Sequence, residues 1–233
     1  WDSAASDFAR AVEIGCPIEQ AQLSGVPQLL FYSDQNAAYR KLCQDLRRSD
    51  RDDPMAVAAR GQLVDDLPGE SAVELANRVE RMLDAMDDKT NSTESSDKKH
   101  RYAGMFYGVN LYVAGWAHLR AGDNEQALRR LEASNRANWF GRGIAHPLIA
   151  IAHHRLGRAD DALGSFQESE ELLDRVLAES VEKSTGSPSI PWVDWIEFLL
   201  HHREASIVVK GHTPAIDQRI LQMQSFAEAA IEE

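Results

Sequence analysis

The chain has 233 residues, of which 43% are hydrophobic, and a formal net charge of −12 at pH 7. This apolar content suffices for a buried core, in one domain or in one continuous solenoid. The negative charge argues against nucleic acid or an anionic membrane surface as a partner, because both would repel it. The sequence contains neither a span of roughly 18 apolar residues nor a signal-peptide pattern. We therefore expect a cytoplasmic protein.

The first part of the sequence predicts helices with an irregular repeat. Ala4, Phe8 and Ala11 have the spacing of the second helix of a helical hairpin, yet no first helix precedes them. We therefore expect the chain to be the C-terminal part of a longer protein. Further helices are expected at residues 18–31, 34–48, 54–64 and 71–86. We interpret residues 1–86 as degenerate helical repeats. Cys16 and Cys43 lack the spacing of metal ligands and are expected to be buried, reduced thiols.

Residues 87–100 are polar and low in complexity, with many Asp, Lys, Ser and Thr side chains. Such a segment has almost no apolar groups to offset the entropy lost on ordering. The composition therefore predicts a flexible loop.

Two later segments repeat each other at an offset of 35 residues. The matching pairs are Gly115 and Ala150, His118 and His153, Gly122 and Gly157, Ala127 and Ala162, and Leu131 and Phe166. A period near 34 with two helices and a glycine turn is typical of the tetratricopeptide repeat, a stacking helical hairpin. Small residues fit where the two helices cross, and a glycine ends the first helix in the left-handed conformation. The pattern predicts two clear repeats over residues 101–182.

The second helices of these two repeats differ in how they begin. Asp123 can cap the first of them, and Gln126 three residues later completes a capping box. The second has Arg158 at the equivalent position. We therefore expect the second helix start to be the weaker of the two.

The C-terminal residues 183–233 predict a last helical hairpin. An apolar helix is expected at 191–210 and a final one at 215–231. A solenoid needs a terminal element that covers its exposed end. The predicted fold is thus all-α, a tetratricopeptide-like helical-hairpin solenoid with a C-terminal capping helix.

Four short motifs follow one another along the chain in a fixed order. They are Trp1-Asp-x-Ala-Ala-x-Asp-Phe-Ala-Arg-Ala-Val-Glu, Ala38-Tyr-Arg-x-x-Cys43, Ala152-His-His-Arg-Leu-Gly157, and Pro191-Trp with Arg203-Glu-Ala205. This succession resembles the C-terminal repeat region of planctomycete serine/threonine protein kinases and related kinase/beta-propeller proteins. The resemblance implies an all-helical region downstream of a kinase or propeller module. The chain itself has no glycine-rich loop after a strand, no His-Arg-Asp motif and no Asp-Phe-Gly motif, so we predict no kinase activity for it.

Histidines are concentrated in the second half of the sequence. Six of the eight are His118, His146, His153, His154, His201 and His202. A metal site would need two or three imidazoles on one face together with a carboxylate. Adjacent residues on a helix point about 100° apart, so the two neighbouring pairs do not chelate one ion easily. We predict packing or partner contacts for these side chains, with no metal, no cofactor and no catalytic residue. The alternative is a histidine-rich, metal-dependent enzyme.

The first helices of the repeats are expected to line a concave groove. The side chains predicted to meet a protein or peptide partner there are Tyr112, Trp116, Leu119, Arg120, Ile151, His154 and Arg155, with Val109 and Pro147 beside them. Aromatic and Arg side chains among aliphatic ones are typical binding anchors. The predicted function is a non-catalytic protein-interaction scaffold. Two alternatives remain open: a regulatory or spacer region of a serine/threonine kinase, and a groove whose aromatic residues belong to the core or lie under the last helix.

Overall fold

The computed structural model describes residues 1–15, 25–48, 56–65, 69–91, 97–137, 139–184 and 186–232, and all regular structure in these ranges is helical. The prediction of an all-α protein is confirmed. The helices are α1 (Asp2–Glu13), α2 (Val26–Tyr32), α3 (Asn36–Arg48), α4 (Val57–Gln62), α5 (Gly69–Asn91), α6 (Asp97–Ala121), α7 (Asn124–Arg136), α8 (His146–Arg155), α9 (Ala159–Lys183), α10 (Trp192–Ala205) and α11 (Gln218–Glu232). A short π-helical segment, η2 (Ser206–Lys210), continues α10.

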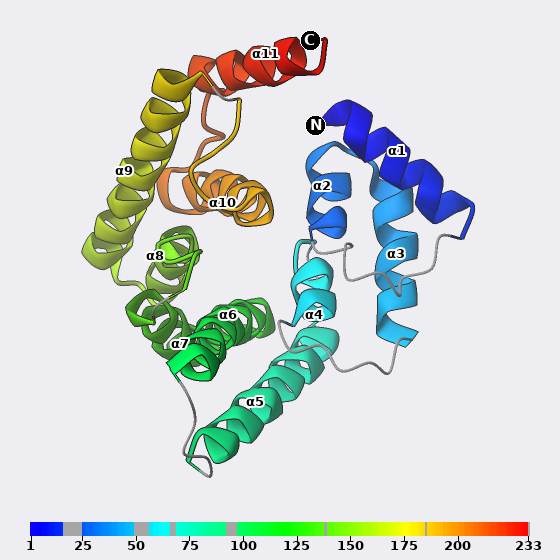
Figure 1. The fold of residues 1–233 in the computed structure, drawn as a ribbon. Helices are drawn as coiled ribbons and strands as arrows, with labels where there is room; N and C mark the ends of the chain where they lie inside the picture. Colours follow the sequence, from blue (N-terminus) through cyan, green and yellow to red (C-terminus); the bar gives the residue numbers. More distant parts are fainter. Residues whose placement is uncertain are drawn as a thin grey trace.

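The helices follow one another around an arc (Figure 1). From α5 to α9 each helix packs against the next in the chain. The arc starts with α1 to α3 and ends with α9, and α11 lies across the opening near the N-terminus. Helix α10 departs from this order, because it lies on the inner side of the arc and packs against α2 and α8.

The turns between the helices of the two clearest hairpins form as expected. Gly122 and Gly157 end the first helices with φ of 86° and 73°, in the left-handed region that favours glycine. Asp123 accepts a hydrogen bond from the backbone N–H of Gln126 at 3.1 Å, whereas Arg158 provides no side-chain cap. The expected difference between the two helix starts is therefore present.

Close packing explains the small residues of the 35-residue pattern. A Cβ placed on Gly115 of α6 would lie 2.6 Å from Cγ of Leu131 on α7. Ala127 and Ala162 are fully buried on the second helices. Small side chains are thus required where these helices meet.

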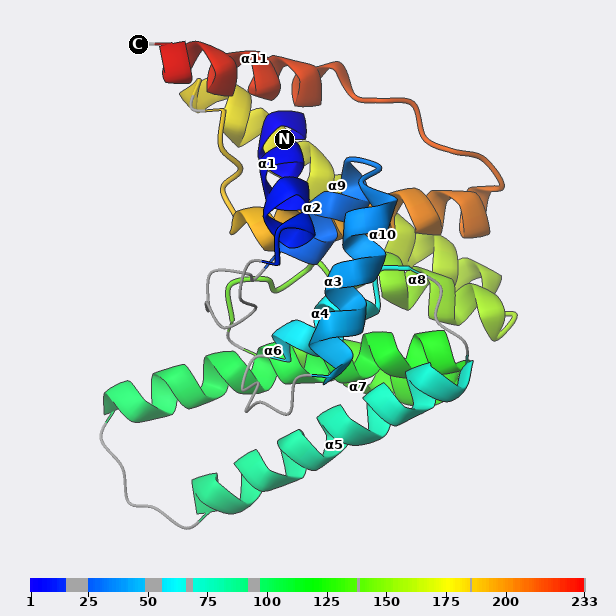
Figure 2. The same cartoon turned by 90° about the vertical axis from the view of Figure 1, so that its right-hand side faces the viewer.

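The predicted loop at residues 87–100 is shorter than expected. Helix α5 continues to Asn91 and α6 begins at Asp97, so most of this stretch is helical. Within this stretch, only residues 92–96 lie outside the described part of the chain. Helices α5 and α6 pack against each other as a hairpin (Figure 2).

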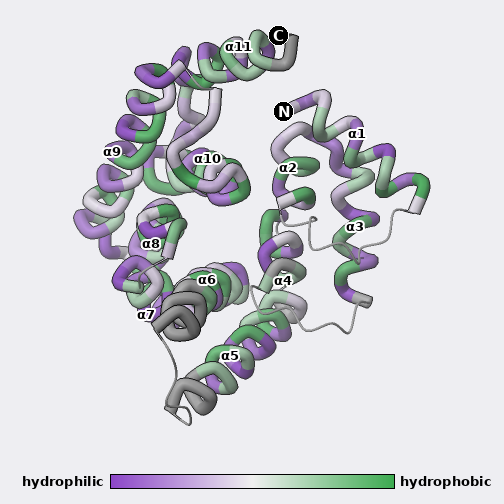
Figure 3. The backbone as a smooth tube through the Cα atoms, in the orientation of Figure 1, coloured by the Kyte–Doolittle hydropathy of each residue, from purple (hydrophilic) through white to green (hydrophobic). Residues whose placement is uncertain are grey.

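The C-terminal hairpin does not act as one cap. Helix α11 packs on α9 at the end of the arc, but α10 lies inside it. Three large side chains of α10, Trp195, Ile196 and Phe198, are fully buried. Figure 3 shows hydrophilic residues along the outer side of α9, where the chain meets solvent. The apolar character of residues 191–210 therefore reflects burial in the centre of the protein rather than coverage of an end.

Of the two cysteines, the structure describes Cys43. Cys43 is buried on α3, and burial raises the pKa of its thiol to about 11. This agrees with the expected reduced core thiol. Cys16 lies outside the described residues.

Candidate helix-binding groove

The predicted groove residues lie mostly in the interior. Tyr112, Trp116, Leu119 and Ile151 are fully buried. The ring of Trp116 meets His201 of α10 edge to face, with 4.4 Å between ring centroids. The prediction that these side chains line an open groove is therefore wrong, because the chain's own helix α10 covers them.

Two of the other predicted groove residues lie nearer to solvent. His154 and Arg155 are exposed at the end of α8, where Arg155 donates a hydrogen bond to the carbonyl of Leu119 at 3.0 Å. Val109 and Pro147 are buried. The last helix, α11, is not the element that covers the aromatic residues; α10 is.

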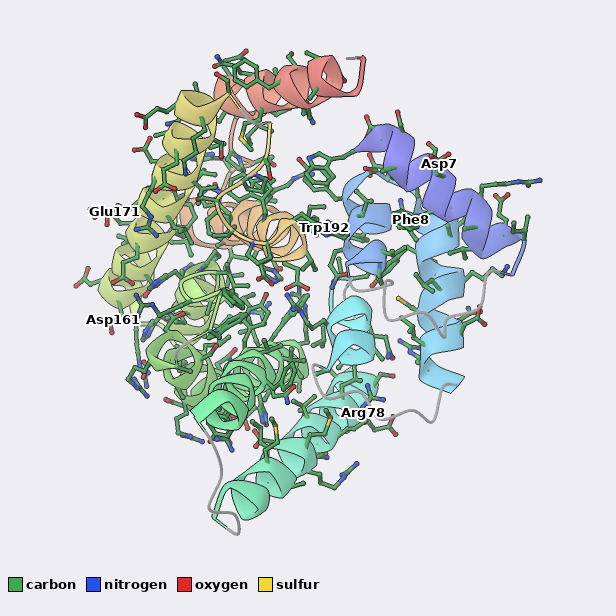
Figure 4. All side chains as sticks on the ribbon, viewed as in Figure 1. Asp7, Phe8, Arg78, Asp161, Glu171 and Trp192 are labelled. Atoms are coloured by element: carbon green, nitrogen blue, oxygen red, sulfur yellow. The ribbon has the colours of Figure 1, made fainter. Side chains whose placement is uncertain are left out.

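At its N-terminal end, α10 packs against the first helices of the chain. The ring of Trp192 stacks on Trp1, with 6.2 Å between centroids. It also occupies the space beside Gly25, where a Cβ would lie 2.6 Å from the Trp192 ring. Figure 4 shows the Trp192 side chain between α10 and the α1–α2 part of the protein. Helix α10 therefore joins the two ends of the arc.

One face of α10 is polar although it points inward. Asp194, Glu197, His201 and Glu204 follow one another at intervals of three, four and three residues. This spacing places all four side chains on one face of a helix. We call these four residues the acidic stripe of α10.

The guanidinium of Arg60, on α4, binds the first two carboxylates of the acidic stripe. Its Nε and Nη2 donate to the two oxygens of Glu197 at 3.0 and 2.6 Å, and Nη2 also donates to Asp194 at 2.7 Å. All three residues are buried. Burial acts to lower the pKa of Arg60, but the two carboxylates outweigh it and raise that pKa above its ordinary value. Arg60 is thus a permanent cation facing α10.

Glu197 is the centre of a wider buried network. Gln28 of α2 donates to it at 2.6 Å and the hydroxyl of Tyr112 at 3.1 Å. The Tyr112 hydroxyl also lies 2.9 Å from Nε2 of His201. Burial raises the pKa of Glu197, with Arg60 acting against this rise, and burial holds the pKa of His201 well below its ordinary value. The network connects α2, α4 and α6 to one helix.

A second arginine binds the far end of the acidic stripe. Arg120 of α6 forms a two-pronged ion pair with Glu204, with N–O distances of 2.5 and 2.7 Å. Its Nε donates to the carbonyl of Leu63 at 3.2 Å. Paired N–H···O bonds of this type fix the orientation of both groups. We call the helices that face α10 from within the arc, α2, α4, α6 and α8, the inner wall. The inner wall therefore holds α10 through Arg60 and Arg120.

The remaining histidines lie apart from one another. His118 contacts Glu80 at 3.0 Å and His146 contacts Glu168 at 2.8 Å. His202 stacks on Phe166 at 5.1 Å between ring centroids. Within the described ranges, no group of three or more His, Cys, Asp or Glu side chains could hold a metal ion. His118, His146 and His202 thus make separate contacts with carboxylates or rings.

Sequence reasoning missed the residues that hold α10 in place. The intervals of the acidic stripe were visible in residues 194–204, but a polar face on an apolar helix suggests solvent exposure. Arg60 lies on a short helix in the part of the chain where the repeat pattern is poor. Its partner Glu197 is 137 positions away, so no local pattern connects the two.

Comparisons with protein-family models, curated proteins and solved structures found no match to this chain. Among the described helices, none is long and apolar enough to cross a membrane.

Proposed function

We propose that this chain is a non-catalytic protein-interaction module of tetratricopeptide-like architecture that binds helical segments on its inner wall. The observation that carries the proposal is the position of α10, which lies in the arc and is bound there by Arg60 and Arg120. A helix held in a groove is a recurring mode of peptide recognition. In this proposal α10 occupies that groove when no partner is bound.

The connections of α10 support its release as a unit. Non-helical residues 186–191 precede it and residues 211–217 follow η2. Gly211 takes a left-handed φ of 78° at the end of η2. In this proposal α10 separates from the wall through these two connections while α9 and α11 stay helical.

The wider setting follows from the sequence resemblance. As a C-terminal region of a larger cytoplasmic signalling protein, such as a serine/threonine kinase with an upstream catalytic domain, the module would recruit partners for that protein. The chain holds none of the kinase motifs, so catalysis would belong to another part of the protein.

A second candidate function is a rigid spacer. The burial of Arg60 and Glu197 favours it, since separating this pair would expose charges that are now matched inside the protein. The two functions differ in one property, which is whether α10 separates from the wall while the rest of the protein stays folded.

Native-state hydrogen exchange on the full chain measures this property directly. We expect the amides of α10 to exchange through an opening that requires less free energy than global unfolding. The amides of α6 and α7 are the internal reference and should exchange only on global unfolding. If α10 and the reference helices share one opening free energy at every urea concentration, the module proposal fails and the spacer remains.

A further inference from the structure

We propose that Asn135, Gly143 and His146 form a pH-sensitive switch in the turn between α7 and α8, which comprises residues 139–145. The switch is closed while the imidazole of His146 is neutral, and it opens when the ring takes up a second proton. Its groups lie on α7, the turn, α8 and α9. It therefore does not rest on the function proposed for α10.

The backbone of the turn determines how the amide of Asn135 is oriented. The N–H of Gly143, a residue with φ of 102°, donates to Oδ1 of Asn135 at 3.2 Å. Because a backbone N–H only donates, the amide atom that faces Gly143 must be the oxygen. The NH₂ group therefore faces His146, where Nδ2 lies 3.4 Å from Nε2 of the ring.

The orientation of this amide in turn determines the tautomer of His146. The NH₂ group of Asn135 only donates, so Nε2 of His146 must accept. The other ring nitrogen, Nδ1, lies 2.8 Å from Oε2 of Glu168 on α9, and an ionised carboxylate only accepts. The neutral ring with its proton on Nδ1 satisfies both neighbours.

A second proton does not fit this arrangement. It would bind at Nε2 and place an N–H against the NH₂ group of Asn135. Rotating the amide by 180° would present its oxygen to His146, but it would also turn the NH₂ group toward the N–H of Gly143. The protonated ring therefore costs one of the two contacts that Asn135 makes.

The groups around the ring set the pH at which the switch opens. The elements packed against it contribute Asn135 from α7, Gly143 from the turn and Glu168 from α9, and of these groups Glu168 carries a charge. Burial lowers the pKa of His146 from its ordinary value of 6.5, and Glu168 acts against this effect. The switch is therefore closed at pH 7 and opens as the pH falls below 6.5.

Other anchors confine the opening to part of the turn. Trp139 is buried and its Nε1 donates to the carbonyl of Ser134 at 3.0 Å, while Ile144 is fully buried. Neither contact involves His146. Loss of the bond to Asn135 should thus change the conformation at Arg142 and Gly143 and leave the helices folded.

A pH titration of the ¹⁵N-labelled full chain by NMR tests the switch. At pH 7.5 the ring of His146 should carry its proton on Nδ1. Below pH 6.5 the Gly143 amide signal should shift with the same midpoint as the His146 ring. Its protection from hydrogen exchange should fall about three- to tenfold, as expected for the loss of one hydrogen bond. The exposed His154 is the internal control, and its titration should leave Gly143 unaffected.

Two variants separate the switch from a simple buried histidine. In Asn135→Asp the carboxylate accepts from both Gly143 and a protonated Nε2, so the pKa of His146 should rise and Gly143 should stay protected at low pH. In His146→Gln the protection of Gly143 should no longer depend on pH, whereas His154→Gln should behave like the unaltered protein. Circular dichroism verifies folding, and the titration of the unaltered chain decides the matter should either variant unfold.

Three results would overturn the inference. One is a His146 ring that carries its proton on Nε2 at pH 7.5, since Asn135 would then be oriented the other way. Another is titration of His146 without any response at Gly143. The third is a folded Asn135→Asp variant in which Gly143 still loses its protection at low pH.

Discussion

Arg60 and Glu197 lie 137 positions apart in the sequence and form two hydrogen bonds, at 3.0 and 2.6 Å, in the interior of the protein. This pair attaches α4, from the irregular first part of the chain, to α10 near its end. Arg60 also donates to Asp194, and Gln28 of α2 donates to Glu197. The contact therefore holds α2 as well. The centre of the fold is therefore polar as well as apolar.

Replacing Arg60 tests how much this centre contributes to stability. Arg60→Met leaves Glu197 and Asp194 buried without their cation, so we expect the free energy of unfolding to fall by about 3–5 kcal/mol. Urea denaturation measures this change. Arg129→Ala, at an exposed position on α7, should change stability by less than about 0.5 kcal/mol. A similarly small change for Arg60→Met would mean that the buried pair is not maintained in solution.

Two glycines in helices predict opposite responses to alanine. At Gly115 the new Cβ would lie 2.6 Å from Leu131, so Gly115→Ala should destabilise the protein by about 1–3 kcal/mol. At Gly164 of α9 no atom beyond the backbone of its own helix lies within 4 Å of the new Cβ, so Gly164→Ala should stabilise the protein by about 0.5–1 kcal/mol. Thermal denaturation of both variants checks the helix register. Effects of the same sign would contradict it.

The unequal helix starts offer a stabilising change. Arg158→Asp would place a side-chain acceptor at the start of α9, where none is present, and should add about 0.5–1 kcal/mol. The matched variant is Asp123→Ala, which removes the hydrogen bond to Gln126 and should cost about 1 kcal/mol. Chemical denaturation midpoints should therefore move in opposite directions for the two variants.

Acidification should weaken the contact between α10 and the wall. Burial, together with the charges of Arg120 and Arg60, holds the pKa of His201 well below its ordinary value of 6.5. The unfolded chain therefore binds a proton below pH 6.5 that the folded chain does not, so stability falls as pH decreases through that value. The loss from this one group at pH 5.5 should be on the order of 1 kcal/mol.

The measurement is the free energy of unfolding at pH 7.5 and at pH 5.5. His201→Gln removes the titrating group, and its stability should fall less between these two values than that of the unaltered protein. His212→Gln, at an exposed position, is the control and should retain the full pH dependence. Identical pH profiles for His201→Gln and the unaltered protein would exclude a buried neutral His201.

Local patterns determined the helical class and the clearest hairpins. The left-handed glycines at 122 and 157, the cap at Asp123 and the small residues at the crossing all depend on neighbours within one hairpin. Such requirements repeat with the hairpin, so a period of 35 residues exposes them in the sequence. The polar segment at 87–100 is the exception, because its composition predicts a loop whereas α5 extends to Asn91 and α6 begins at Asp97.

Only the tertiary structure shows that the inner wall is covered and which charged residues pair there. Tyr112, Trp116 and Ile151 have the composition of a binding surface, and only the position of α10 shows that they are covered. The pairing of Arg60 with Glu197 and of Arg120 with Glu204 joins positions 137 and 84 residues apart. Contacts at such separations have no period along the chain, because they depend on how far the whole arc curves before its last helices return to it.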